Sequence, residues 1–353
     1  MTDIAEPRFH PAEYRIRLFL SVDLSGSTAF KNSSSGENRE KGSAPRWVTV
    51  FQQFYKDFPA LFSSEFQKQK TDSVGGDGCP KLWKAVGDEL VFCGTISNQK
   101  ACIVALNAFI STLHTYRKRL NDEGVDLNVK GAAWLGAFPE PNRTVQLRPT
   151  DGTPELHSAS EALEASADKA PFDYDFLGKA IDTGFRVAGN AKPERFILSV
   201  QLARLIVGGG AELGFGHQVR LDRPLTLKGV NRNEPYPVLY IDTIQHLESE
   251  RTFLLERELV SVDTPPNAAK LDTYLEAYCS MVGTDEIKLK VDATAADIEP
   301  PESYIKHKAL IETHLQSMVG KEFDGANGGE DEAEGEATEL DGIQLEPLKP
   351  EPT

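Results

Sequence analysis

The stretch RLFLSVDLSGSTAFK, residues 17–31, decides how the start of the chain folds. Its first half is apolar and predicts a buried strand over residues 15–22, because a short continuous apolar run is typical of a strand covered on both faces. Asp23 then ends the run, and small and hydroxyl residues, SGST, follow at positions 25–28. We therefore expect a strand that ends in a carboxylate, followed by a loop whose backbone N–H groups can hold a phosphate at a helix start.

A second acidic residue, Asp88, lies in the stretch KAVGDELVF at positions 84–92. Two short apolar runs flank a Gly-Asp pair there, which predicts a β-hairpin with Gly87 and Asp88 at its tip. If this hairpin neighbours the first strand, the carboxylates of Asp23 and Asp88 point at one spot. Two carboxylates and a backbone carbonyl are ligands that suit Mg²⁺ or Mn²⁺ bound to a nucleoside triphosphate. Taken singly, an aspartate in either place is more often a helix cap or a turn residue.

The rest of the pattern predicts alternating strands and helices. Apolar residues recur at helical spacing in 47–66 and 97–121, and apolar runs typical of strands occur at 125–138 and 195–200. The expected order is βα-ββ-α-β-α-β-α-ββ, which indicates an α/β (α+β) fold, a mixed sheet with helices packed on it. We interpret the polar region 139–172 as an insertion.

Composition divides the chain into three expected parts. Residues 1–245 carry the strand and helix pattern, residues 246–320 carry further helical pattern, and residues 321–353 form an acidic tail. The tail has eleven acidic residues and one basic residue between Glu322 and Glu351. Because it has too few apolar side chains to offset the entropy of ordering, we expect it to be disordered. The net charge of −16 argues against bulk attraction to nucleic acid or to an anionic membrane.

The cysteines and the hydropathy pattern indicate the compartment. None of the four cysteines forms a C-x-x-C pair, so a zinc site and a disulfide framework are poor interpretations and reduced thiols fit best. No N-terminal apolar run resembles a signal peptide, and no stretch of about 18 apolar residues could span a bilayer. We therefore expect a soluble, cytoplasmic protein.

Four stretches together resemble the class III nucleotidyl cyclases, and they occur in that family's order. FLSVDLSGSTAF (19–30) is similar to the family's first metal-binding segment, and KAVGDELVF is similar to the second. DFLGKAIDTGFRVAG (175–189) is similar to the third segment, and TLKG (226–229) is similar to the segment with the phosphate-binding lysine. The first three are specific in combination, whereas TLKG alone carries no weight. The resemblance covers residues 15–242.

The resemblance implies a metal site with two ions, Mn²⁺ or Mg²⁺. By residue type and position, Asp23 and Asp88 would bind both ions, with help from the backbone carbonyl of Leu24. Ser27 and Thr28 would lie in the phosphate loop beside them. Asp23, Leu24 and Asp88 are thus the expected metal-binding residues, and Ser27 and Thr28 are expected to bind the substrate.

Five further residues would face the substrate. The resemblance implies that Lys84 and Asp175 contact the base, that Arg186 stabilises charge developing on the α-phosphate, and that Lys228 holds the triphosphate. Asp182 departs from the family, which usually has Asn there. An ionised Asp only accepts hydrogen bonds, so it adds repulsion near the ribose and phosphates unless a cation such as Arg186 offsets it. Without the motifs, Arg186 is more often a helix residue paired with an acid, and the two lysines are more often solvated.

The base itself stays open at this point, because a lysine donor and an aspartate acceptor suit adenine, cytosine and uracil alike. Pocket size has to decide, and an aromatic from helix 47–66, one of Phe51, Phe54 or Tyr55, would favour a pyrimidine. The stretches DLSGSTAFK and GDELVF and the Asp182 variant resemble the bacterial pyrimidine cyclases of Pycsar anti-phage systems, whose product activates a separate effector protein. The resemblance implies uridylate cyclase activity, UTP to cyclic UMP, with cyclic CMP and cyclic AMP as alternatives.

The resemblance also implies an assembly. In class III cyclases the metal aspartates of one chain face the base-contacting pair and the arginine of another, and this chain carries one copy of each motif. We therefore expect a two-fold homodimer with two shared sites. Two other classes of function are weighed against this one. A non-enzymatic nucleotide-binding module would usually have lost a metal aspartate or the arginine, and an interaction protein would work through helices 266–318.

Overall fold

The computed structural model describes residues 10–34, 44–147, 160–243, 251–259, 266–284 and 286–326. Its centre is a seven-stranded sheet in the order β2-β3-β1-β4-β7-β11-β8. Neighbouring strands run antiparallel except β4 and β7, which are parallel, so the sheet is mixed, as the sequence predicts. The strands of this sheet are β1 (Arg15–Ser25), β2 (Lys81–Val86), β3 (Glu89–Ile96), β4 (Asn128–Phe138), β7 (Arg195–Leu198), β8 (Val219–Leu221) and β11 (Leu239–Asp242).

Two short strand pairs stand outside this sheet, and the helices connect and cover the strands. The pairs are β5 (Arg143–Gln146) with β6 (Tyr174–Leu177), and β9 (Leu225–Thr226) with β10 (Pro235–Tyr236). The helices are α1 (Ser27–Ser34), α2 (Arg46–Gln69), α3 (Gln99–Asp122), α4 (Glu161–Lys169), α5 (Lys179–Ala188), α6 (Val200–Gly209), α7 (Arg251–Leu259), α8 (Ala268–Val282) and α9 (Glu302–Ala326).

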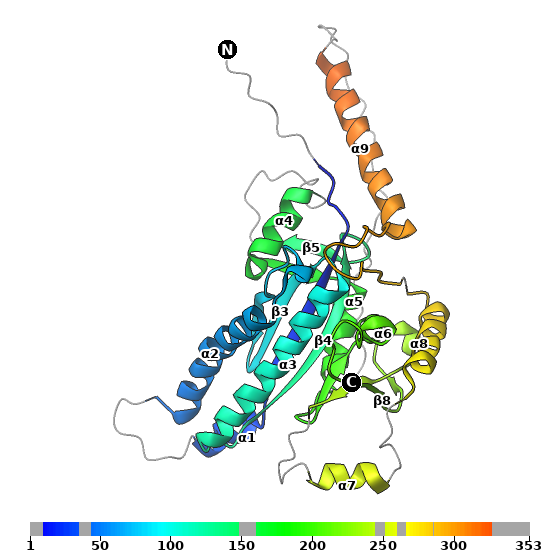
Figure 1. Cartoon of the computed structure of the whole chain (residues 1–353). Helices are drawn as coiled ribbons and strands as arrows, with labels where there is room; N and C mark the ends of the chain where they lie inside the picture. Colours follow the sequence, from blue (N-terminus) through cyan, green and yellow to red (C-terminus); the bar gives the residue numbers. More distant parts are fainter. Residues whose placement is uncertain are drawn as a thin grey trace, which may run out of the picture. The chain divides into compact units, whose positions relative to one another are not determined.

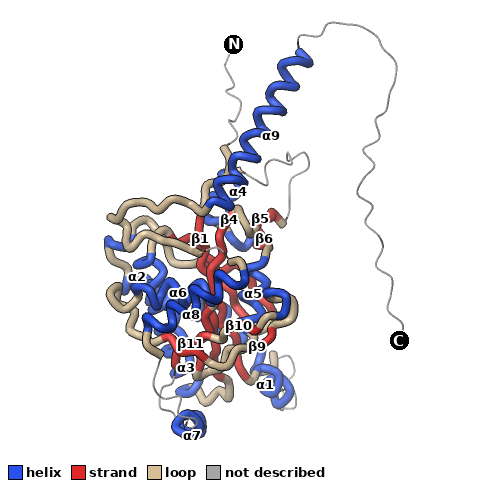
Figure 2. The backbone as a smooth tube through the Cα atoms, turned by 90° about the vertical axis from the view of Figure 1, so that its right-hand side faces the viewer, coloured by secondary structure: helices blue, strands red, loops and turns tan. Residues whose placement is uncertain are grey.

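Helices cover both faces of β1, whose successive side chains point to opposite sides of the sheet. Leu18, Leu20 and Val22 belong to a large core that α2 and α3 fill with buried phenylalanines. Phe19 belongs to a second core on the other face, together with Trp134 and residues of α5. Figure 1 shows α2 and α3 side by side along the sheet, and Figure 2 shows strands between α2 and α5. The continuous apolar run of β1 therefore reflects burial on both faces.

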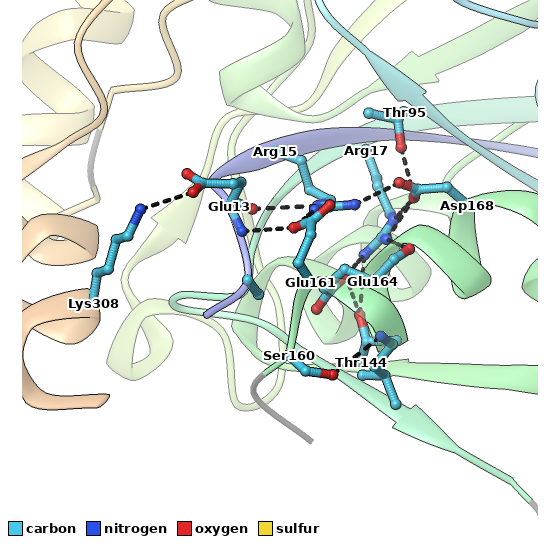
Figure 3. Close-up of polar contacts among 12 residues, drawn as sticks. Glu13, Arg15, Arg17, Thr95, Thr144, Ser160, Glu161, Glu164, Asp168 and Lys308 are labelled. Atoms are coloured by element: carbon cyan, nitrogen blue, oxygen red, sulfur yellow. Dashed lines mark hydrogen bonds and ion pairs between the residues drawn. The ribbon is translucent and has the colours of Figure 1, made fainter. Parts of the chain in front are cut away.

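The inserted region between β4 and α5 is attached to β1 by ion pairs of two buried arginines with acidic residues of α4 (Figure 3). The guanidinium of Arg17, which is 1% exposed, lies 2.7 Å from Glu164 Oε2 and 2.5 Å from Asp168 Oδ1. Arg15 forms ion pairs with Asp168, at 2.6 Å, and with Glu161. Because both buried arginines have acidic partners on α4, the network fixes α4 against the first residues of β1.

The chain divides into two compact units, residues 1–311 and 312–353. In the first unit, Leu271 and Leu275 of α8 belong to the large core, and the division predicted at residue 245 stays a prediction. Helix α9 continues six residues into the predicted acidic tail, and the rest of that tail, 327–353, lies outside the described residues. None of the four cysteines is disulfide-bonded. Among the described helices, none is both long and apolar enough to cross a membrane.

Candidate active site

Asp23 and Asp88 lie together at one end of the sheet. The N–H of Leu24 donates a 3.2 Å hydrogen bond to the carbonyl of Asp88, and Asp23 is paired across the strands with Glu89. Both aspartates are half-buried, and with Leu24 they line a hollow of about 600 Å³. The structure therefore brings together two carboxylates that are 65 positions apart in the sequence.

The predicted end of the first strand differs from the observed one. Strand β1 stays paired with β4 as far as Ser25, so Asp23 lies inside the strand and not at its tip. Gly87 and Asp88 form the turn between β2 and β3, as predicted. Gly87 has a φ of +64°, a conformation that glycine adopts without strain. The hairpin is thus where the sequence places it, and the strand is longer because β4 extends its ladder.

The loop after Asp23 leads into α1. Gly26 has a φ of +90°, and its carbonyl accepts a 3.0 Å hydrogen bond from the N–H of Phe30, which closes the first turn of α1. Ser27 is buried and Thr28 is exposed, and both line the same hollow as Asp23. Backbone N–H groups at a helix start lack partners within the helix and favour anions. The hollow therefore combines carboxylates with a helix start that suits phosphate.

Two further residues line the hollow, Lys130 and Glu89, and the sequence does not predict either of them as a site residue. Lys130 of β4 lies opposite Asp23, and its Nζ is 2.9 Å from Asp23 Oδ2. Burial raises the pKa of Glu89, the negative charge of Asp23 raises it further, and a hydrogen bond with Ser21 partly offsets this. Both residues reach the hollow through the register of neighbouring strands, for which the sequence carries no local signal.

The hollow fits a hard divalent cation. Its acidic groups offer the oxygen donors that such an ion prefers. The ammonium of Lys130 is paired with Asp23, so a bound ion would have to compete with it for that carboxylate. In the part of the chain that the structure describes, no group of three or more His, Cys, Asp or Glu side chains is arranged to hold a metal ion. Asp23, Asp88 and the Leu24 carbonyl would therefore have to share an ion with phosphate oxygens of a substrate.

Lys84 and Asp175, 91 positions apart in the sequence, form an ion pair. Lys84 Nζ lies 2.7 Å from Asp175 Oδ1, and the two side chains are 30% and 29% exposed. The same ammonium lies 3.9 Å from the ring centre of Trp83, which adds a cation–π attraction. Asp175 Oδ1 also accepts a 2.9 Å hydrogen bond from the N–H of Phe176. These contacts hold one donor and one acceptor side by side at a partly open surface.

Helix α5 presents Asp182 and Arg186 one turn apart, and both are exposed. Gly178 precedes the first residue of the helix. Its φ is +135°, and an added Cβ there would lie 2.4 Å from Asn142 Oδ1, so glycine is required. Among the described residues, the guanidinium of Arg186 has no hydrogen bond or ion pair. Within the described residues, Arg186 is therefore not paired with an acidic residue, contrary to the alternative interpretation.

Lys228 is exposed on the segment between β9 and β10. The next residue, Gly229, has a φ of +76°, and an added Cβ there would lie 3.9 Å from Nη2 of Arg186. The segment that carries Lys228 therefore passes directly beside Arg186. Among the described residues, neither Lys228 nor Arg186 has a side-chain ion pair, and the loop and the helix that carry these two cations lie next to each other. Cationic side chains on neighbouring segments create a local positive potential that suits an anion.

Tyr55 lies at the turn that carries Asp88. Its hydroxyl donates a hydrogen bond to the carbonyl of Gly87, and its ring is 38% exposed. Phe51 and Phe54, the other aromatic candidates on α2, are buried in the core. Within one chain the contacts of Tyr55 are therefore with the hairpin turn and with α2, and not with the Lys84 ion pair.

The predicted site residues thus form two groups. No hydrogen bond or ion pair within the described ranges joins a member of one group to a member of the other. The residues of the first group line the hollow: they are Asp23, Leu24, Ser27, Thr28 and Asp88. The second group contains three cations and two aspartates: Lys84, Arg186, Lys228, Asp175 and Asp182.

Comparison with known proteins gives remote structural similarity only. No family model matches this chain, and no curated protein matches it. The adenylyl cyclase CyaB from P. aeruginosa is 11% identical with a TM-score of 0.44, over 67% of this chain and 97% of that chain. The guanylyl cyclase Cya2 is 14% identical with a TM-score of 0.41, over 66% and 93%. The guanylate cyclase domain of RhGC from Catenaria anguillulae, solved with GTP, is 11% identical with a TM-score of 0.39, over 65% and 98%. Identity and TM-score this low say nothing by themselves about the activity of this chain.

Proposed function

We propose that this chain is a class III nucleotidyl cyclase, which converts a nucleoside triphosphate into the 3′,5′-cyclic monophosphate and pyrophosphate. The observation that carries the proposal is the ion pair of Lys84 and Asp175, 2.7 Å long. The motifs assign both residues to the base, and a base edge needs one donor and one acceptor side by side.

The two groups of site residues support a shared site in a homodimer. The hollow at Asp23 and Asp88 offers places for metal ions and phosphates, but it contains no base-contacting pair. The group with Arg186 and Lys228 offers contacts for the base and the triphosphate, but it has no metal carboxylates. A two-fold dimer that places the first group of one chain opposite the second group of its partner would form two complete sites.

The proposed reaction is an in-line displacement at the α-phosphorus. The ribose 3′-oxygen forms a bond to that phosphorus, the bond to the bridging oxygen of the β-phosphate breaks, pyrophosphate leaves with the electron pair, and the 3′-hydroxyl proton passes to water. Asp23, Asp88 and the Leu24 carbonyl would hold two Mn²⁺ or Mg²⁺ ions, which would supply positive charge for the 3′-oxygen and for the leaving pyrophosphate. Arg186 would stabilise the charge that develops on the α-phosphate oxygens, and Lys228 would hold the terminal phosphates. Asp182 would accept a hydrogen bond from the ribose, with its charge offset by Arg186 one turn away.

We propose UTP as the preferred substrate, CTP as the second and ATP as the third. Uracil O4 can accept from Lys84 and its N3–H can donate to Asp175, whereas cytosine uses N3 and its amine for the same two groups. Within one chain Tyr55 does not reach this pair, so an aromatic wall from Tyr55 would come from the partner, through the turn that carries Asp88. Overpacking by a purine costs about 1–3 kcal/mol, which is about 5- to 150-fold in rate. By resemblance to Pycsar cyclases, the product would be an anti-phage second messenger read by a separate effector.

The test is a competition assay. The purified chain is incubated with ATP, GTP, CTP and UTP at equal concentration and with Mn²⁺, and the cyclic products and pyrophosphate are identified by mass. Cyclic UMP should be the main product, and Asp23→Ala or Asp88→Ala should abolish it while the fold is kept. A clear preference for ATP would remove the pyrimidine part of the proposal only. If the wild-type chain forms no cyclic product from any triphosphate, the cyclase proposal is wrong.

A further inference from the structure

The segment that carries Lys228 has an unusual backbone. We call residues 227–234 the Lys228 loop. Three consecutive residues of this loop have positive φ angles, Asn231 at 47°, Arg232 at 56° and Asn233 at 66°. Asparagine tolerates this left-handed conformation better than most residues, but a run of three, with an arginine at its centre, is costly for L-residues. The loop keeps this conformation only if other parts of the molecule hold it.

Contacts on both sides of Asn231 hold the loop. The side chain of Val230 is buried, and the loop has three internal backbone hydrogen bonds of 2.9–3.0 Å. The side-chain amide of Asn231 donates a 2.8 Å hydrogen bond to the hydroxyl of Tyr278, which is a residue of α8. The ring of Tyr278 packs edge-on against Tyr236, with ring centres 6.1 Å apart and planes at 83°. The one side-chain hydrogen bond that crosses from the described part of this loop to another element is therefore the bond to α8.

Helix α8 is itself firmly attached to the core. Leu271, Leu275 and Cys279 are buried in the large hydrophobic core, and α8 packs against α6, which lies next to it in Figure 1. Arg204 of α6 adds an ion pair with Glu286, just after α8, at 3.0 Å. Tyr278 is therefore a fixed point, and a group bonded to its hydroxyl is held relative to the sheet.

We propose that Tyr278 is a positioning residue, which holds Asn231 and thereby fixes the Lys228 loop beside Arg186. The proposal rests on the role given to Lys228 under the proposed function. Helix α8 lies beyond the predicted catalytic region 1–245. Through Tyr278 it would support the loop at the phosphate-binding end of the site. The hydroxyl of Tyr278 does not touch the nucleotide and acts through Asn231.

The decisive variant is Tyr278→Phe, which removes one oxygen atom and leaves the packing of the ring. Tyr274→Phe is the matched control, because Tyr274 lies one turn earlier on α8 and, among the described residues, its hydroxyl makes no hydrogen bond to the Lys228 loop. Asn231→Asp is the conservative rescue, because the hydroxyl of Tyr278 can donate to a carboxylate. Hydrogen exchange is measured for the amides of Val230, Asn233 and Glu234, and calorimetry measures the affinity for inorganic pyrophosphate in the presence of Mn²⁺.

In Tyr278→Phe, exchange of the loop amides should become about 2- to 10-fold faster and the Kd for pyrophosphate should rise by a similar factor, as expected for the loss of one hydrogen bond. The KM for the triphosphate should rise in parallel, whereas Tyr274→Phe should match wild type and Asn231→Asp should keep most of the loop protection. Unchanged exchange and unchanged pyrophosphate affinity in Tyr278→Phe would overturn this inference whatever the activity. If the loop loosens but the wild-type chain makes no cyclic nucleotide, the support of the loop stands and the proposed function fails.

Discussion

Replacing Gly184 with alanine tests whether the position of α5 controls the site. Gly184 lies in α5 between Asp182 and Arg186, and an added Cβ would lie 2.5 Å from three atoms of the Trp134 indole. That indole is stacked on Phe19, with ring centres 5.6 Å apart and planes 6° apart. Because the ring is buried and cannot swing aside, α5 has to shift and to move Asp182 and Arg186 with it.

Two effects of opposite sign act on the stability of Gly184→Ala. Alanine favours a helix over glycine by about 1 kcal/mol. Overpacking a dense core costs about 1–3 kcal/mol, and a 2.5 Å contact with a rigid ring belongs at the upper end of that range. We expect the free energy of unfolding to fall by about 1–2 kcal/mol, which lowers Tm by about 2–6 °C.

Gly208→Ala on α6 is the matched control, because an added Cβ there meets nothing within 4 Å. Only helix propensity changes at this position, so the free energy of unfolding of the control should rise by about 0.5–1 kcal/mol. Urea unfolding followed by circular dichroism measures both variants, and steady-state kinetics should show kcat/KM of Gly184→Ala reduced about 10- to 100-fold. If Gly184→Ala is as stable as Gly208→Ala and as active as wild type, the reasoning is refuted.

Three further predictions concern charge. Lys130→Met should tighten Mn²⁺ binding without nucleotide about 2- to 5-fold in calorimetry, because the ammonium no longer competes for Asp23. Removal of divalent ions with EDTA should abolish cyclic product and leave near-UV circular dichroism unchanged, and added Mn²⁺ should restore activity. Burial raises the pKa of Asp168, but the charge of Arg17 and its neighbours lowers that pKa on balance. Because the pKa of Asp168 is lower in the folded state, the carboxylate stabilises the fold above its unfolded pKa of about 3.9, and this contribution is lost as pH falls through the folded-state pKa. Thermal stability should therefore drop below about pH 4, and it should drop less steeply in Asp168→Asn.

Each of these predictions has an outcome that contradicts it. Unchanged Mn²⁺ affinity in Lys130→Met would show that the ammonium does not compete for the carboxylate. Cyclic product formed in excess EDTA would contradict the two-ion site. An equal loss of stability at low pH in wild type and Asp168→Asn would show that this carboxylate does not cause the acid sensitivity.

The sequence predicts those parts of the site that local patterns encode. The apolar run before Asp23 and the Gly-Asp pair at Gly87 and Asp88 each specify a strand or a turn through residues close together in the chain, and the mixed sheet and the hairpin are confirmed. The sequence alone cannot show that Lys84 and Asp175 meet. The resemblance assigns both residues to the base, which stays a prediction, and the structure adds that the two side chains form an ion pair.

The parts that the sequence misses depend on register and on contacts between distant segments. Lys130 lies opposite Asp23 because β4 pairs with β1 in one register, and a shift by one residue would turn its side chain to the other face. The support of the Lys228 loop by Tyr278 joins residues on either side of the predicted boundary at 245. The contact of Tyr55 with the Gly87 turn is also missed, because helical spacing places Tyr55 on α2 but does not show which distant turn its hydroxyl reaches.

Subunit mixing tests the central claim, a cyclase with sites shared between two chains, most directly. The Asp23→Ala chain and the Arg186→Ala chain should each be inactive alone, because each damages both sites of its own homodimer. In an equal mixture, random exchange gives heterodimers with one undamaged site, so about a quarter of wild-type cyclic nucleotide formation should return. Exchange itself is confirmed by co-purification of differently tagged chains. If the chains exchange and no activity returns while wild type is active, the shared-site account is wrong.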